Sequence, residues 1–103
     1  MANHQILTES ELHSALQRLR DWSLKGQNIE AGFEFATFRD AIAFVVQIAI
    51  EAETAGHHPE IRISYKRVAF SLCTHDAGFR ITDRDIEMAS RISAAAHRFQ
   101  SMT

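Results

Sequence analysis

Two adjacent histidines, His57 and His58, lie between Gly56 and Pro59, directly after the most apolar run of this chain. Imidazole has an unperturbed pKa of about 6.5, so at neutral pH it can both donate and accept a proton. Positioned acid–base groups of this type each contribute roughly 10²- to 10⁴-fold to a reaction rate. The sequence places no Gly-rich phosphate loop and no serine or cysteine nucleophile motif beside them. These residues therefore favour a cofactor-free elimination, addition or isomerisation.

A third imidazole, His75, is expected to meet this pair through a hairpin. The alternation of apolar residues predicts one strand that runs to about residue 65 and a second that returns over 68–74. In an antiparallel hairpin, residues whose numbers add to about 132 then face each other, which places His75 opposite His57 or His58. The strand arithmetic thus predicts that three imidazoles converge on one edge of the sheet.

Other polar residues near this corner have both functional and structural interpretations. Glu53 lies four residues before His57, so on a continuing helix its carboxylate would face the same corner, although it could equally be an exposed helix-end group. Asp85 is explained as the acidic partner of a helix cap, and Tyr65 could be a core aromatic. The remaining histidines are interpreted as ordinary surface groups: His4, His13 and His97.

A metal site is the first alternative use of three histidines, because catalytic zinc often has three protein ligands. Adjacent histidines rarely bind one ion together, since neighbouring side chains diverge in an extended backbone. Cys73, two positions before His75, should share the face of that residue, or could be a small core residue. Proton transfer is therefore favoured over metal binding.

Capping patterns predict three helices that would position these groups. Threonine followed three residues later by an acidic residue is typical of a helix start, and Gly56 is a natural stop for the second helix. The three pairs are Thr8 and Glu11, Thr37 and Asp40, and Thr82 and Asp85.

Alternating apolar residues predict strands over 29–35, 61–65 and 68–74, with a short strand near Trp22 and Leu24. The order helix, strand, strand, helix, strand, strand, helix predicts an α+β fold with helices on one face of two hairpins.

The second predicted helix is apolar on almost every side, from Ala41 to Ile50. Such a helix has to be covered on more than one side. It is therefore either the central helix of the core, or a helix that also meets a second subunit, and both can hold together.

Length and composition predict a single domain over residues 1–103. A net charge of −2, without a Lys/Arg cluster, argues against nucleic acid as a partner. The single cysteine excludes an internal disulfide, and the N-terminus lacks the pattern of a secretion signal. The longest apolar run is too short to cross a bilayer, which takes about 20 residues. A cytoplasmic location without membrane contact is the expectation.

The histidine pattern resembles that of a known family. The arrangement Glu53-x3-His57-His58-Pro59-x5-Tyr65-x9-His75-x9-Asp85 is similar to the signature of the pterin-4a-carbinolamine dehydratases. The resemblance covers nearly the whole chain, from about Thr8 to Phe99. Further segments that carry it are 33–35, 38–41, 71–75 and 82–86.

The resemblance implies an α+β fold with a four-stranded antiparallel sheet and three helices on one face. It implies dehydration of 4a-hydroxytetrahydropterin to quinonoid dihydropterin and water, in tetrahydropterin recycling, with no metal or organic cofactor. Members act on the product of aromatic amino acid hydroxylases, which are functional partners, and form homodimers or homotetramers through sheet edges. Animal members also act as dimerisation cofactors of a transcription factor, so an oligomeric adaptor that retains the pterin pocket is the alternative.

The resemblance also assigns roles by position. His57 and His75 are the acid–base candidates, with the choice between acid and base left open. His58 chiefly binds and orients the substrate, and Glu53 supports the histidines, so both join the catalytic group. The residues expected to line the pterin are His57, His58, Pro59, Thr74, His75, Asp76 and Ala77.

Overall fold

A computed structural model describes residues 5–101 of the chain. Helix α1 (Glu9–Arg18) begins after Thr8 with the predicted capping box. The Oγ1 atom of Thr8 accepts a hydrogen bond from the Glu11 amide at 3.1 Å, and the Glu11 carboxylate accepts one from the Thr8 amide at 2.9 Å. Two amides that the helix would leave unpaired are satisfied in this way, so the start of α1 is fixed locally.

Helix α2 (Phe38–Ala55) begins and ends where the sequence predicts. The hydroxyl of Thr37 accepts a hydrogen bond from the Asp40 amide at 3.0 Å. Gly56 ends the helix in the left-handed conformation, with φ of 66°, which glycine adopts without the steric cost of a Cβ atom.

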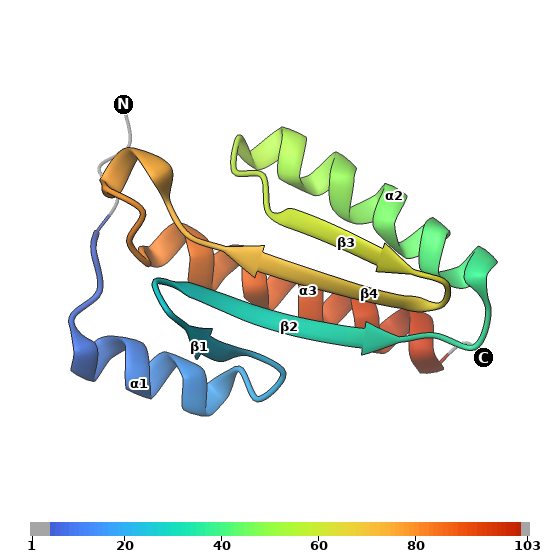
Figure 1. The fold of residues 1–103 in the computed structure, drawn as a ribbon, viewed down its shortest axis with the longest axis horizontal. Helices are drawn as coiled ribbons and strands as arrows, with labels where there is room; N and C mark the ends of the chain where they lie inside the picture. Colours follow the sequence, from blue (N-terminus) through green and yellow to red (C-terminus); the bar gives the residue numbers. More distant parts are fainter. Residues whose placement is uncertain (1–4, 102–103) are drawn as a thin grey trace.

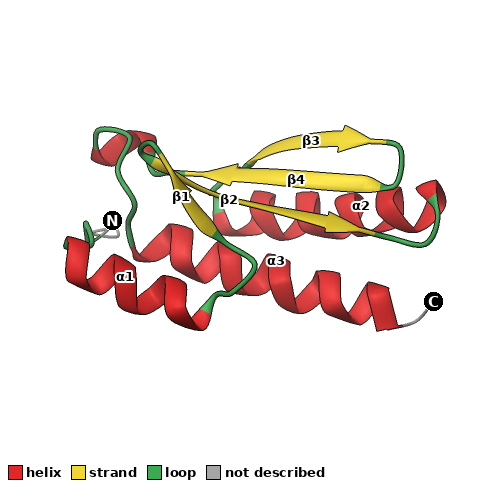
Figure 2. Cartoon of the chain, turned by 60° about the horizontal axis from the view of Figure 1, so that its bottom comes forward, coloured by secondary structure: helices red, strands yellow, loops and turns green. Residues whose placement is uncertain are grey.

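Four strands form one antiparallel sheet in the order β1-β2-β4-β3. They are β1 (Ser23–Lys25), β2 (Asn28–Glu34), β3 (Glu60–Ser64) and β4 (Arg67–Leu72). A short 3₁₀ helix, η1 (His75–Ala77), and helix α3 (Asp83–Ser101) follow the sheet (Figure 1). All three α-helices lie on the same face of the sheet, which confirms the predicted α+β architecture (Figure 2).

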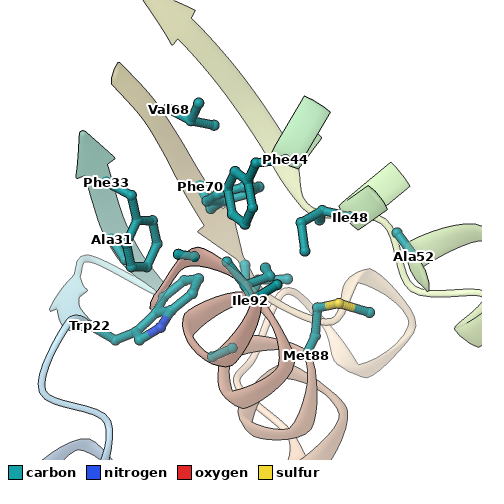
Figure 3. Close-up of a cluster of buried hydrophobic side chains, with 14 of the residues drawn as sticks. Trp22, Ala31, Phe33, Phe44, Ile48, Ala52, Val68, Phe70, Met88 and Ile92 are labelled. Atoms are coloured by element: carbon teal, nitrogen blue, oxygen red, sulfur yellow. The ribbon is translucent and has the colours of Figure 1, made fainter. Parts of the chain in front are cut away.

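The core lies between the sheet and helices α2 and α3 (Figure 3). Phe44 of α2 packs edge-on against Phe70 of β4, with ring centroids 5.7 Å apart, and both side chains are buried. The indole Nε1 of Trp22 donates a buried hydrogen bond to Oγ of Ser93 at 2.9 Å. Close packing of this kind holds the helix ends in fixed positions relative to the sheet.

One side of α2 is core and the other is open in this chain. Phe44 and Ile48 have no exposed surface, whereas Val46 and Ile50 are 54% and 63% exposed. The interpretation of α2 as a central core helix is therefore confirmed for its inner side.

The β3–β4 hairpin differs from its sequence prediction at the tip. Tyr65 has a φ of 54° and is 69% exposed, so it is a turn residue and not part of the core. The turn at the tip moves the strand register by one residue from the predicted pairing, so that Glu60 faces Ser71. Strand β4 also ends at Leu72, two residues earlier than predicted, because the Thr74 amide bonds to the Arg80 carbonyl and the chain turns into η1.

Candidate active site

His57 is positioned by the end of α2 and by the first turn of α3. Gly56 turns the chain out of the helix, and His57, which follows it, is buried. Its Nε2 atom lies 2.6 Å from Oδ1 of Asp85, a side chain with no exposed surface. The packing of α2 against α3 thus brings together two groups that are 28 residues apart.

Asp85 receives two further hydrogen bonds on its other carboxylate oxygen. Oδ2 accepts from Oγ1 of Thr74 at 2.9 Å and from the amide of Thr82 at 2.8 Å. The two threonine hydroxyls are themselves 2.7 Å apart. A buried charge needs such partners, since an uncompensated carboxylate would be strongly destabilising.

This network defines the proton positions on His57. An ionised carboxylate can only accept hydrogen bonds, so Nε2 of His57 carries the proton that faces Asp85. Among the described residues Nδ1 has no protein partner, and none of their buried side-chain nitrogens or oxygens is unpaired. Nδ1 therefore reaches solvent, and in this tautomer it carries the lone pair of the ring.

Asp85 has a second role in addition to the capping role that the sequence predicts. Its carboxylate does accept the Thr82 amide, as a capping partner would, but the Thr82 hydroxyl accepts from the Arg84 amide instead of from that of Asp85. The capping box of α3 is thus only half formed. The same carboxylate is the partner of His57, which sequence reasoning did not assign.

His58 lies beside His57 in a more open setting. Its Nε2 atom is 2.8 Å from Oε1 of Glu53, and the two side chains are 62% and 80% exposed. Glu53 therefore faces the corner of the histidines, as its spacing predicts, and its contact there is with His58. An exposed pair of this kind adds only about 0–1 kcal/mol, so it orients the imidazole more than it stabilises the fold.

His75 reaches the same corner by a different route from the predicted one. It begins η1 instead of continuing β4, and its side chain is exposed. Its ring lies against that of Phe79, with centroids 4.7 Å apart. The chain therefore delivers His75 through a turn beyond the sheet, not through ladder pairing with His57.

All three imidazoles line one cavity of about 230 Å³. A neighbouring cavity of about 340 Å³ shares His58, Cys73 and His75 with it. The first is lined by Gly56, His57, His58, Cys73, Thr74, His75, Asp76 and Arg84, and the second by Asn28, His58, Pro59, Glu60, Ser71, Cys73 and His75.

The residues expected at the pterin line these cavities, with the exception of Ala77. Thr74 borders the first cavity but is only 1% exposed, and its hydroxyl is already engaged with Asp85 and Thr82. Thr74 is thus placed to support the site from behind.

Cys73 borders both cavities as a protonated thiol. Burial raises the pKa of the Cys73 thiol above its ordinary value, and the negative charge of Asp85 raises it further. Within residues 5–101, no group of three or more His, Cys, Asp or Glu side chains is arranged to hold a metal ion.

Arg84 lines the first cavity, and sequence reasoning did not predict it there. Its Nη2 atom donates to the carbonyls of Gly56 at 2.6 Å and Ala55 at 3.3 Å. A cation at this position satisfies carbonyls that the end of α2 leaves unpaired and complements the helix dipole. Arg84 thereby fixes the segment that carries His57, and no sequence pattern predicts that contact.

The remaining histidines that the structure describes lie elsewhere. His13 is exposed on α1 and contacts Gln17, and His97 pairs with Asp21 at 2.9 Å. His4 lies outside the described residues. A larger hollow of about 850 Å³ between α1 and α3 has no histidine or cysteine in its lining, so the three clustered histidines belong to the smaller cavities.

The fold and the site together define a small α+β protein with a three-histidine pocket. Residues 5–95 match the model of the pterin 4 alpha carbinolamine dehydratase family, and the chain belongs to that family. A relative from Koribacter versatilis is 47% identical over 86% of this chain and 94% of its own length. Another from Chloroflexus aurantiacus is 46% identical over 84% of this chain and 91% of its own. The names of both assign them provisionally to the pterin-4-alpha-carbinolamine dehydratases.

Solved structures show the same fold. A protein from Brucella melitensis, described as a transcriptional coactivator/pterin dehydratase, superposes with a TM-score of 0.84 at 39% identity, over 89% of this chain and 99% of its own. A pterin dehydratase-like protein described as a RuBisCO assembly factor in the alpha-carboxysome superposes with a TM-score of 0.60 at 24% identity, over 73% and 86% of the two chains. The second likeness concerns the fold alone.

Proposed function

We propose that this chain is a dehydratase that converts 4a-hydroxytetrahydropterin to quinonoid dihydropterin and water, in tetrahydropterin recycling. A base removes the proton from the pterin ring nitrogen, and that N–H electron pair forms the new C=N bond. An acid protonates the 4a hydroxyl, which leaves as water with its C–O bonding pair. The observation that carries the proposal is the meeting of three imidazoles around one cavity in a chain of this family.

His57 is the proposed base and His75 the proposed acid. The Asp85 carboxylate holds the proton on Nε2 of His57 and would face the positive charge that forms when Nδ1 takes up a second proton. His75 has no carboxylate partner among the described residues, which favours return of its proton to the leaving hydroxyl. His58 and Glu53 would orient the substrate beside Pro59 and Asp76.

The test is the dehydration rate of chemically prepared 4a-hydroxytetrahydropterin with and without the purified chain. His57→Gln keeps a donor toward Asp85 but removes the base, so the rate should fall by about 10²- to 10⁴-fold. His75→Gln should lower it by a comparable factor. His13→Gln, on the exposed side of α1, is the control and should leave the rate unchanged. No acceleration by the wild-type chain would refute the proposed function.

We also propose that the protein works as a homodimer or homotetramer. The open apolar residues of α2, Val46 and Ile50, support this, and so does the edge strand β3, where Ile63 is 44% exposed. Ile50→Glu would place a charge on the open side of α2. If α2 is an interface, that variant should sediment as a smaller species than wild type at micromolar concentration. Equal sedimentation of the variant and wild type would show that α2 is not the interface.

The proposed substrate arises when aromatic amino acid hydroxylases turn over, so we place the enzyme in the cytoplasm as a functional partner of such a hydroxylase. Within residues 5–101, none of the helices combines the length and the hydropathy that crossing a bilayer demands.

An oligomeric adaptor is the second candidate function. The observation that favours it is the open side of α2, where Val46, Ala49 and Ile50 border a hollow of about 470 Å³. The Brucella relative, described partly as a transcriptional coactivator, points in the same direction. Capture of a stoichiometric protein partner that is lost in Ile50→Glu, together with no turnover of the pterin, would support the adaptor over the enzyme.

A further inference from the structure

Each of the three pocket histidines is held by a partner of a different kind. His57 is bonded to a buried carboxylate, and His58 to an exposed one. Among the described residues, no side-chain hydrogen bond holds the His75 ring, and its ring contact is with Phe79. What fixes the orientation of His75 is therefore a question about Phe79.

Phe79 adopts a backbone conformation that is unfavourable for its side chain. Its φ is 60°, in the left-handed region that bulky residues rarely occupy. Gly78 before it also has a positive φ, of 76°, but glycine adopts this conformation freely. A strained residue persists only where the surrounding structure holds it, and such residues cluster at functional sites.

The surrounding loop does hold Phe79. Thr74 and Arg80 close its base with two backbone hydrogen bonds of 2.8 and 3.3 Å. Inside the loop, the amide of Gly78 bonds to the carbonyl of His75 at 3.0 Å. The backbone of His75 and that of Phe79 therefore belong to one closed turn, and their ring centroids lie 4.7 Å apart.

Burial does not explain a phenylalanine at this position. Phe79 is 54% exposed, and it is not among the residues that pack against the hydrophobic core. It also lines neither of the two histidine cavities, so it is not placed to contact a ligand there. Among the described residues, the ring of Phe79 contacts that of His75, with the two ring planes inclined at 37°.

We propose that Phe79 is a positioning residue that holds the imidazole of His75 toward the cavity. Its ring lies against the imidazole and excludes the rotamers that would swing His75 into solvent. Because His75 is the proposed acid, this inference rests on the proposed function for its catalytic consequence, but not for its structural one.

The kinetic test compares Phe79→Ala, Phe79→Gly and Phe79→Tyr in the full chain. We expect the first two to lower kcat on the order of 10- to 100-fold, with KM within about twofold, because a displaced acid impairs the chemical step. Phe79→Tyr keeps the ring and should rescue kcat. The thermal midpoint of Phe79→Gly should equal or exceed that of wild type, because glycine relieves the strain at this φ.

A double variant separates positioning from a general structural effect. In the His75→Gln background, Phe79→Ala should cause no further loss of kcat, because both changes act through the same imidazole. Phe38→Ala is the matched control, since Phe38 is also half exposed and stacks on an exposed ring, that of Tyr65. That control should keep the wild-type kcat. Additive losses in the double variant, or a wild-type kcat in Phe79→Ala, would overturn the proposal.

A readout without turnover keeps the two proposals distinguishable. In carbon–proton correlation spectra, the His75 ring protons should show a ring-current shift that is kept in Phe79→Tyr and lost in Phe79→Ala. If the wild-type chain fails to dehydrate the pterin, the proposed function fails while this spectrum still decides the role of Phe79. Identical His75 resonances in wild type and Phe79→Ala would overturn the role, whatever the activity.

Discussion

Asp85→Asn separates what the buried carboxylate does for the fold from what it does for the chemistry. Oδ2 holds Thr74 and the Thr82 amide, while Oδ1 holds Nε2 of His57 at 2.6 Å. An asparagine of the same shape can place its carbonyl oxygen toward the two threonines and keep both of those bonds. Its NH₂ group then faces His57, where two donors would oppose each other unless the imidazole changes tautomer.

The change of tautomer predicts a large kinetic effect. With Nε2 as the acceptor, the proton moves to Nδ1, and His57 presents no lone pair to the cavity. In serine proteases, the same exchange of aspartate for asparagine at the carboxylate that bonds the catalytic histidine lowers kcat by about 10⁴-fold. Loss of a general base lowers the rate by about 10²- to 10⁴-fold. We expect Asp85→Asn to lower kcat within that range.

The effect on stability should be small by comparison. Hydrogen bonds to a charged group contribute about 1.5–3 kcal/mol and neutral ones about 0.5–1.5 kcal/mol, while removal of a buried charge recovers part of its desolvation cost. We therefore expect a loss of about 1–2 kcal/mol in the free energy of unfolding. For a domain of this size, each kcal/mol lowers the thermal midpoint by about 4–8 °C.

Initial rates with 4a-hydroxytetrahydropterin, thermal unfolding and nitrogen NMR of the His57 ring test the three expectations. Asp21→Asn is the matched control, because Asp21 also pairs with a histidine, His97, at 2.9 Å, but neither residue lines a histidine cavity. It should leave kcat unchanged. A folded Asp85→Asn protein with kcat within about threefold of wild type would refute the argument from the tautomer.

Three further predictions concern stability, each read from chemical or thermal unfolding. Because the pKa of Cys73 is raised in the folded protein, the stability that this thiol contributes should be complete below about pH 9 and be lost as the pH rises further. Cys73→Ala should therefore reduce the alkaline loss of stability. Ser93→Ala leaves the buried indole N–H of Trp22 without its acceptor and should cost about 1–3 kcal/mol, whereas a loss below 0.5 kcal/mol would contradict the buried bond. Gly56→Ala places a Cβ at φ of 66° and should cost about 1 kcal/mol, and an unchanged midpoint would argue against the left-handed end of α2.

The helix boundaries were predictable because their signals are local. The Thr8 hydroxyl and the Glu11 carboxylate act within one turn, and Gly56 ends α2 through its own backbone freedom. The hairpin register was not, because Tyr65 takes a positive φ that sequence rules reserve for glycine and asparagine. That residue shifts the strand register by one position. The predicted strand pairing therefore placed His75 near His57 and His58, but did not predict that it lies in η1, beyond the end of β4.

The missed role of Asp85 has a different cause. An acidic residue three positions after a threonine satisfies the pattern of a helix cap whether it is exposed or buried. In this fold Asp85 has two roles. It accepts a hydrogen bond from the Thr82 amide and, because it has no exposed surface, it also holds His57 through a buried bond. The contact with His57 depends on how α3 packs against the end of α2. A local sequence pattern contains no information on that packing.

The three partners imply an order of sensitivity among the histidines. The Asp85 bond to His57 is buried, so water cannot replace it, and its loss should act on the chemical step. The Glu53 bond to His58 is exposed on both sides, so water competes with it and its loss should act mainly on substrate binding. Loss of the Phe79 contact with His75 should have an intermediate effect, because a ring contact limits the rotamers of His75 but does not fix a proton on its ring. Glu53→Gln should therefore raise KM by a small factor and leave kcat nearly unchanged, and a loss of kcat as large as in Asp85→Asn would show that burial does not determine this order.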